Sequence, residues 1–260
     1  MRTTIVVRAL VIACIGAASA PAPARADVWD RSLPSDGSAA TRTELVHGSD
    51  ELHDLAKKGS APDEDWYRVT QQPYASYEIL VEATAGEIAP PVLERLAADG
   101  ATVLQTATGI GSIGFTRSLR WQNGAVAVED QTIRVRSGSC VKCKKDAAYR
   151  IRAFETTYRL PRFNNSGTQV TVLVVQNPTD AAITGNVHFW NASGALLATH
   201  AFALQAKALL NLQTQTVVPD SSGSATVSHD GRYGDLAGKA VALEPATGFA
   251  FDTNLEPRPK

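Results

Sequence analysis

Apolar and polar residues alternate along most of this sequence, and this period of two constrains the fold more than any other feature. In SYEILVEA, residues 76–83, Tyr77, Ile79 and Val81 fall on one side of an extended chain and two glutamates fall on the other. Successive side chains of a strand point to opposite faces, so the pattern predicts antiparallel strands with one buried face. Comparable runs occur at 114–121, 133–136, 149–155, 168–176, 186–190, 200–205, 225–227, 239–243 and 249–253.

Two segments have apolar residues at helical spacing instead, SDELHDLAKK at 49–58 and PPVLERLAAD at 90–99. The Asp99-Gly100 pair after the second segment is typical of a tight hairpin, and we predict a strand over Val92–Leu96. Glycine-containing turns bound several other runs, because tight hairpins need the positive φ that glycine adopts easily. The predicted fold class is therefore all-β.

The composition of LPRFNNSG, residues 160–167, predicts a boundary between two domains. A proline and a polar NNSG follow the preceding strand pattern, and the basic bias of that region stops there. We predict two antiparallel β-sandwich domains in tandem, at 40–159 and 160–256, each of about a hundred residues and able to form its own core. We expect 27–39 to be a disordered lead-in and 257–260 to be a free tail.

The first 26 residues have the layout of a secretory signal peptide. Arg2 and Arg8 form a basic start, 9–20 is an apolar run too short to span a membrane, and small residues precede Ala26. We predict cleavage after Ala26 and a periplasmic or secreted product. A second interpretation is a bacterial lipobox ending at Cys14, which would make the chain a lipoprotein.

Charge is distributed unevenly along a chain whose formal net charge is only −1. Residues 27–90 carry 13 acidic and 5 basic side chains, whereas 117–162 carry 4 acidic and 11 basic ones. The net charge excludes polyanion binding by bulk attraction. The basic stretch nevertheless predicts a local positive field.

Arginine alternates with apolar residues on both sides of a loop within this basic stretch. If the two flanking strands pair, their guanidinium groups share one face, which would fit carboxylated or sulfated polysaccharide or an anionic envelope surface. The residues of this face are Arg134, Arg136, Arg150, Arg152, Lys142, Lys144 and Lys145. A solvated strand face whose charges discourage edge aggregation explains the same pattern. Nucleic acid is not an expected partner, because interleaved stacking aromatics are lacking.

The loop between those strands contains a C-x-x-C, formed by Cys140 and Cys143. A zinc ribbon would need a second such pair or paired histidines, and the histidines here are scattered. A redox dithiol needs the N-terminus of a helix in a βαβ unit, which the strand pattern does not provide. In an exported protein we predict a disulfide that shapes the loop and gives no indication of an enzyme.

Asp63, Glu64 and Asp65 are candidate calcium ligands, because calcium prefers six to eight oxygen ligands and further carboxylates lie upstream. The alternative that we favour is a solvated acidic loop before the strand that begins near Trp66. No other cofactor is expected. GIGSIG at 109–114 fits a dinucleotide fingerprint, but a strand follows it where that fingerprint needs a helix.

The first domain resembles the bacterial pre-peptidase C-terminal domain in the order of its motifs. The resemblance rests on Gly48, on DEDWYRV at 63–69, on Tyr77-Glu78-Ile79, on the hairpin at 90–104 and on Tyr149-Arg150-Ile151. It implies a non-catalytic β-sandwich attached to secreted proteins, often beside hydrolases. The second domain is similar in pattern to the immunoglobulin-like modules of bacterial surface proteins.

Together these features predict an exported, non-enzymatic protein that binds or scaffolds at the cell envelope or outside it, with polysaccharide or a secreted protein as partner. The sequence contains no G-x-S-x-G and no H-E-x-x-H motif. An accessory domain pair for a separately encoded hydrolase is the second hypothesis. A divergent secreted hydrolase is the third, because paired carboxylates meet only in space.

The predicted disulfide has a direct chemical test. Alkylation of the unfolded but unreduced mature protein should leave its mass unchanged, because both sulfurs are already bonded. Prior reduction should allow two alkyl groups to add. Two added groups without reduction would contradict the disulfide.

Overall fold

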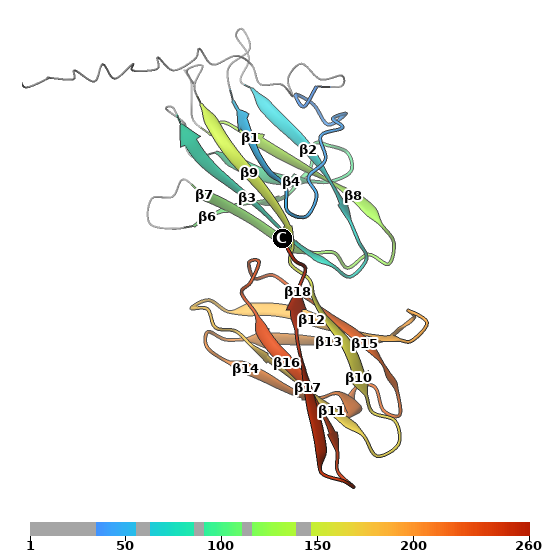
Figure 1. Cartoon of the computed structure of the whole chain (residues 1–260). Coiled ribbons are helices and arrows are strands. Elements are labelled where there is room, and N and C mark those ends of the chain that lie inside the picture. Colours follow the sequence, from blue (N-terminus) through green and yellow to red (C-terminus); the bar gives the residue numbers. More distant parts are fainter. Residues whose placement is uncertain (1–34, 56–62, 86–90, 111–115, 139–146) are drawn as a thin grey trace, which may run out of the picture.

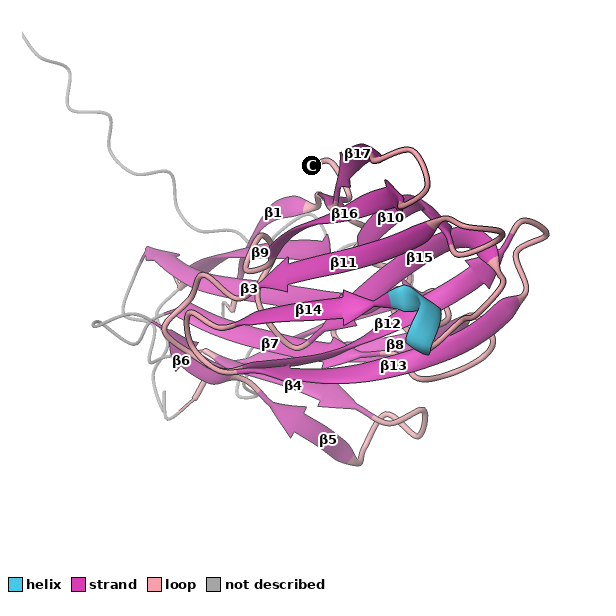
Figure 2. Cartoon of the chain, turned by 90° about the horizontal axis from the view of Figure 1, so that it is seen from below, coloured by secondary structure: helices cyan, strands magenta, loops and turns pink. Residues whose placement is uncertain are grey.

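The computed structural model describes residues 35–55, 63–85, 91–110, 116–138 and 147–260 and consists of two β-sandwiches that follow one another along the chain (Figure 1). Four antiparallel sheets form these sandwiches, which confirms the predicted all-β class. The helical structure in the described part is a short 3₁₀ turn, η2, at Thr214–Thr216 (Figure 2). None of the described helices is long and apolar enough to cross a membrane.

The first sandwich has one sheet in the order β1-β9-β3-β7-β6 and a second in the order β2-β8-β4-β5. Its strands are β1 (Asp50–Asp54), β2 (Glu64–Gln71), β3 (Ser76–Ala85), β4 (Val92–Leu96), β5 (Val103–Thr106), β6 (Thr108–Ile110), β7 (Thr116–Gln122), β8 (Glu129–Arg136) and β9 (Ala148–Glu155). The strand predicted over Val92–Leu96 is confirmed as β4. The helix candidate at 49–58 contains β1 instead, whose backbone pairs with β9.

Alternation places the apolar side chains of both sheets in a single core between them. Tyr67 and Val69 of β2 are buried against Ile79 and Val81 of β3, and Ile133 of β8 is also fully enclosed. Burial of these side chains is the main source of stability for such a sandwich, at roughly 1.5–3 kcal/mol for each large apolar side chain.

The second sandwich has one sheet in the order β13-β12-β15-β10-β18 and another in the order β14-β11-β16-β17. Its strands are β10 (Tyr158–Asn164), β11 (Val170–Gln176), β12 (Ile183–Asn191), β13 (Leu196–Leu204), β14 (Leu209–Gln213), β15 (Ser222–His229), β16 (Ala237–Glu244), β17 (Phe249–Asn254) and β18 (Glu256–Pro257). Phe163 and Phe189 pack edge to face, with ring centroids 5.3 Å apart, in its separate core.

The segment expected to link the domains is in fact the first strand of the second sandwich. β10 begins at Tyr158, and its pairing with β15 is interrupted between Leu160 and Phe163. Pro161 lies in this bulge, where a residue without a backbone N–H is tolerated. Pro161 and the residues around it therefore belong to a strand and not to a linker, because the bulge lets a proline-containing segment continue the sheet.

Polar side chains of the first sandwich bind the second one where the two meet. The Gln122 side-chain oxygen accepts hydrogen bonds from Asn186 Nδ2 and Ser228 Oγ, both at 3.0 Å. Glu78 of β3 is buried and accepts a 2.9 Å hydrogen bond from the backbone N–H of Tyr233. These bonds fix the position of one sandwich against the other, because buried polar groups left without partners would be costly.

The last residues also lie at this junction, and the prediction of a free tail is wrong (Figure 1). Arg258 forms an ion pair with the mostly buried carboxylate of Glu155. His47 Nε2 lies 2.8 Å from the backbone oxygen of Pro259, and the Lys260 ammonium lies 4.9 Å from the ring centroid of Phe154. The C-terminal segment therefore connects the second sandwich to the first.

Deleting Pro257–Lys260 should lower the free energy of unfolding by about 1–2 kcal/mol, because the ion pair between Arg258 and the mostly buried Glu155 carboxylate is lost. The corresponding drop in melting temperature is about 2–8 °C for a chain of this size. Circular dichroism during heating measures it.

Removing Lys260 alone is the control, because it deletes an exposed cation and keeps the Arg258 ion pair. An equal effect of both deletions, or no effect of the longer one, would show that the docked tail does not stabilise the junction.

Candidate ligand-binding groove

The arginines predicted to share one face lie on strands of two different sheets. Arg134 and Arg136 belong to β8, which pairs with β2 and β4, whereas Arg150 and Arg152 belong to β9, which pairs with β1 and β3. The prediction that the two flanking strands pair is therefore wrong. The chain passes from one sheet to the other between them, so these arginines do not form one face of a hairpin.

Each of these four guanidinium groups also has a carboxylate partner. Glu94 forms ion pairs with both arginines of β8, at a nitrogen–oxygen distance of 2.7 Å for Arg134 and 2.9 Å for Arg136. The hydrogen bond from Arg136, together with that from Arg134, lowers the pKa of Glu94 despite its partial burial. Arg150 pairs with Asp50 at 2.9 Å, and Arg152 pairs with Glu82 at 3.3 Å. Local neutralisation leaves little field for an external anion.

The three predicted calcium ligands do not converge on one point. Asp63 and Asp65 are buried, whereas Glu64 between them reaches Arg134 at 3.5 Å. Alternation along β2 explains the difference, because neighbouring side chains of a strand point to opposite faces. The favoured solvated acidic loop is also wrong for Asp65, which is 1% exposed inside the first sandwich. Calcium binding itself stays a prediction.

Among the described residues, one cluster could hold a metal ion and consists of Asp36, His53 and Asp65. Each offers one ligand atom, and these atoms lie within 4.8 Å of one another. Asp65 accepts a 2.5 Å hydrogen bond from the Tyr149 hydroxyl, which in turn contacts that of Tyr67. Burial raises the pKa of Asp65 well above its ordinary value, and the neighbouring Asp36 and Asp63 act in the same direction. An imidazole with two carboxylates suits a transition metal better than calcium.

Several predicted residues lie outside the described part of the chain. They are Cys14, Ala26, Cys140, Lys142, Cys143, Lys144 and Lys145. The disulfide, the signal peptide and the loop lysines therefore stay predictions.

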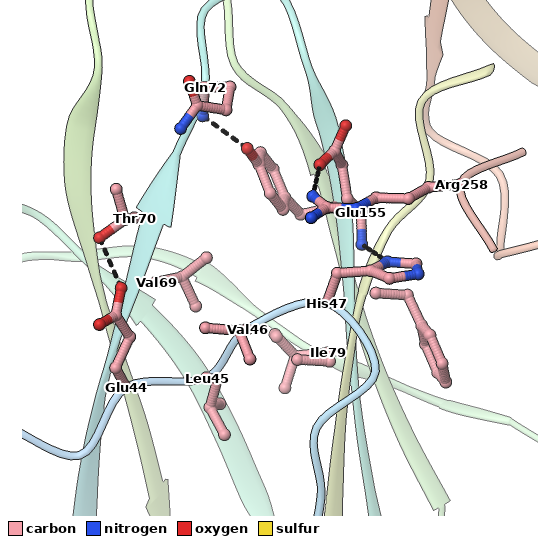
Figure 3. A pocket seen from close by; sticks show the side chains of 13 residues that line it. Glu44, Leu45, Val46, His47, Val69, Thr70, Gln72, Ile79, Glu155 and Arg258 are labelled. Carbon is pink, nitrogen blue, oxygen red and sulfur yellow. Dashed lines mark hydrogen bonds and ion pairs between the residues drawn. The ribbon is translucent and has the colours of Figure 1, made fainter. Parts of the chain in front are cut away.

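A cavity of about 210 Å³ opens beside the C-terminal segment in the first sandwich (Figure 3). Its charged groups already bind each other. Glu44 accepts a 2.8 Å hydrogen bond from Thr70, Glu155 pairs with Arg258, and His47 Nδ1 accepts the Glu155 backbone N–H at 2.9 Å. This cavity is part of the junction packing and offers no uncompensated charge to a ligand.

The outer face of the sheet β13-β12-β15-β10-β18 carries a different combination of side chains. Pairing places Arg159 of β10, Thr226 of β15 and His188 of β12 in one row across this face. Trp190 of β12 and Ser224 of β15 occupy the next row. Directly paired residues of antiparallel strands point to the same side, so these five side chains line one surface.

The bulge in β10 makes this surface concave at one end. Pro161 and Arg162 there face Ser224, and they line a recess of about 420 Å³ together with Asn191 and Gly223. A Cβ atom at Gly223 would lie 1.8 Å from the backbone oxygen of Trp190, so only glycine allows the strands to approach this closely. We call the recess and the adjoining rows of Arg159 and Trp190 the groove.

The two arginines of the groove differ from those of the first domain. Arg159 and Arg162 are exposed, and within the described residues neither takes part in an ion pair or a side-chain hydrogen bond. Glu256 of β18 is paired in register with Arg159 and is the nearest acidic position on this row. The groove thus presents two guanidinium groups to solvent beside one carboxylate, which favours an anionic ligand.

An aromatic wall borders the groove and includes a residue from the first sandwich. Tyr74, in the turn between β2 and β3, lies with its ring centroid 5.0 Å from that of His188 and 5.4 Å from that of Trp190. Burial lowers the pKa of His188 to about 4, so its imidazole is neutral at physiological pH. Tyr74 has φ of 58°, a left-handed conformation that is unfavourable for a bulky residue and that the surrounding contacts must maintain.

Sequence reasoning missed this groove although part of the signal was available. The basic stretch at 117–162 includes Arg159 and Arg162, but strand alternation drew attention to the earlier arginines. The bulge, the pairing of β10 with β15 and the approach of Tyr74 depend on contacts between distant segments. A pattern within a short stretch of sequence cannot predict contacts of this kind.

The fold defines a protein of two β-sandwich domains. No protein-family model and no curated protein matches the chain. Among solved structures it is similar to the pre-peptidase C-terminal domain of a collagenase from Bacillus anthracis, with 10% identity and a TM-score of 0.33, over 43% of this chain and 92% of that one. This is the family that the first domain resembles in sequence. The immunoglobulin-like likeness of the second domain stays a prediction.

The chain is also similar to a β-glucuronidase from Bacteroides uniformis, with 13% identity and a TM-score of 0.22, over 75% of this chain and 25% of that one. A β-glucuronidase of glycoside hydrolase family 2 matches with 11% identity and a TM-score of 0.21, over 84% of this chain and 26% of that one. The chain thus spans about a quarter of the length of these enzymes.

The buried Asp65 should make stability depend on pH. Its pKa is higher in the folded state than in the unfolded one, so its contribution is present below about pH 4 and is lost as the pH rises toward the folded value. Asp65→Asn keeps an acceptor for Tyr149 and removes the ionisation. Urea unfolding in EDTA should show that the free energy of unfolding of the variant rises relative to that of the wild type as the pH increases from 4 to 7.5. A stability difference between variant and wild type that does not change with pH would contradict this account.

Proposed function

We propose that this is an exported, non-enzymatic binding protein whose second domain holds an anionic ligand in the groove. The observation that carries the proposal is the contrast between two sets of arginines. Those of the first domain are paired with Glu94, Asp50 and Glu82, whereas Arg159 and Arg162 are exposed without an ion pair in the described part of the chain.

The surroundings of these two arginines support a binding role. Guanidinium groups form two parallel hydrogen bonds to a carboxylate, and Ser222, Ser224 and Asn191 add hydroxyl and amide groups beside them. The recess of the groove is open to solvent, which leaves room for a segment of an extended polymer. Export rests on the leader at 1–26 and is part of the proposal.

Two double variants with equal charge changes test the location of the site. Arg159→Ser with Arg162→Ser should weaken binding of polygalacturonate, a carboxylated polymer, at least tenfold, because both exposed guanidinium groups are lost. Arg150→Ser with Arg152→Ser should stay within about twofold of the wild type, because those groups are already neutralised. Isothermal calorimetry at two salt concentrations measures both, and wild-type affinity should fall with salt.

Glu256→Gln provides a control of opposite sign. Removing a carboxylate from the position beside Arg159 should strengthen binding about two- to threefold. Equal loss in both double variants, or loss with the Arg150 and Arg152 pair alone, would overturn the groove as the site. Absence of polyanion binding by the wild type would overturn the function.

A further inference from the structure

We propose that the ligand of the groove is a carbohydrate chain that bears carboxylates, with a sugar ring packed against Trp190. This inference rests on the proposed function and adds the chemical class of the ligand. It starts from the aromatic wall, which a site for bare negative charge would not need.

Trp190 is held in a fixed orientation at the edge of the groove. Its indole Nε1–H donates a 3.0 Å hydrogen bond to Thr226 Oγ1, and its ring meets that of Tyr74 nearly edge to face, at 69°. The polar edge of the indole is therefore satisfied within the protein, while the ring remains partly exposed. A rigid, partly exposed indole offers an apolar surface at little entropic cost.

The polar groups near the ring suit hydroxyl-rich ligands. The side-chain oxygen of Asn191 accepts hydrogen bonds from the backbone N–H groups of Ser193, at 3.0 Å, and Ala195, at 2.8 Å, which fixes the orientation of the amide. Its Nδ2 group has no hydrogen-bond partner within the described residues, and Asn191 and Ser224 are both among the residues that line the recess. Amide and hydroxyl groups of this kind can donate to and accept from the hydroxyl groups of a sugar ring.

Charge and aromatic surface together distinguish between classes of polyanion. Polyglutamate and polyphosphate would satisfy Arg159 and Arg162 but would leave the apolar surface of Trp190 unused. A uronic-acid polymer satisfies both, because each ring carries a carboxylate and an apolar face of C–H groups. The groove combines these two features on neighbouring rows of one sheet.

The strained turn at Tyr74 makes the site depend on both domains. Tyr74 belongs to the first sandwich, and its ring covers His188, which is only 5% exposed on the second. The hydrogen bonds that the Gln122 side-chain oxygen accepts from Asn186 and Ser228 hold the two sandwiches in this arrangement. The complete wall therefore exists only in the two-domain protein, which is the form that the test must use.

The test compares two polymers of the same charge, polygalacturonate and poly-L-glutamate, on the intact mature chain. Trp190→Ala should weaken polygalacturonate binding about tenfold, which corresponds to about 1.4 kcal/mol, and should leave polyglutamate binding within twofold. Trp190→Phe retains a ring and should recover most of the loss. Phe251→Ala removes an exposed aromatic residue from β17, away from the groove, and should change neither affinity.

The possible results distinguish failure of the carbohydrate inference from failure of the proposed function. Equal binding of both polymers, with no effect of Trp190→Ala, would overturn the carbohydrate inference while Arg159 and Arg162 retained their role. Binding of neither polymer by the wild type would overturn the proposed function itself. If Trp190→Ala fails to fold, Trp190→Phe decides instead: binding of polygalacturonate above polyglutamate supports the inference, and equal binding overturns it.

Discussion

The structure depends on a buried carboxylate that needs both domains. Glu78 belongs to β3 of the first sandwich and accepts a hydrogen bond from Ser118 of the same sheet at 2.8 Å. Its other partners, the Tyr233 backbone N–H and the Arg232 guanidinium, come from the second sandwich. Glu78 is 1% exposed in the two-domain structure, so its carboxylate depends there on these partners from the second sandwich. The junction is therefore a specific contact between the two sandwiches. It also fixes the position of Tyr74 beside Trp190 at the groove.

Neutralisation explains which charged surfaces remain available for binding. Glu94 pairs with two arginines, and Asp50 and Glu82 each pair with another. These four arginines of the basic segment are therefore neutralised locally in the fold. Arg159 and Arg162 lie in a strand that bulges at a proline, and the strand opposite them supplies glycine and serine at that point. These two arginines, unpaired within the described residues, lie where local sheet geometry is irregular, a common location for binding sites.

Much of the fold could be predicted from the sequence, because alternation is a local signal. Tyr77, Ile79 and Val81 fall on one side of their strand by the period of two alone, and Val92–Leu96 follows from a hairpin signal. The site could not be predicted in the same way. Arg134 and Arg150 have the same pattern as residues of a shared face, and only strand pairing shows that they belong to different sheets.

The sequence by itself determined that the chain forms strands and, for a strand such as β8, which side is buried. Tertiary structure alone decided that β8 and β9 lie in different sheets, that Asp65 is enclosed beside Tyr149, and that Tyr74 contacts Trp190. The physical reason is that side-chain alternation fixes the face of a strand, whereas the neighbours of that face come from residues far away in the chain. Their charges and hydrogen bonds then decide which side chains remain available for a ligand.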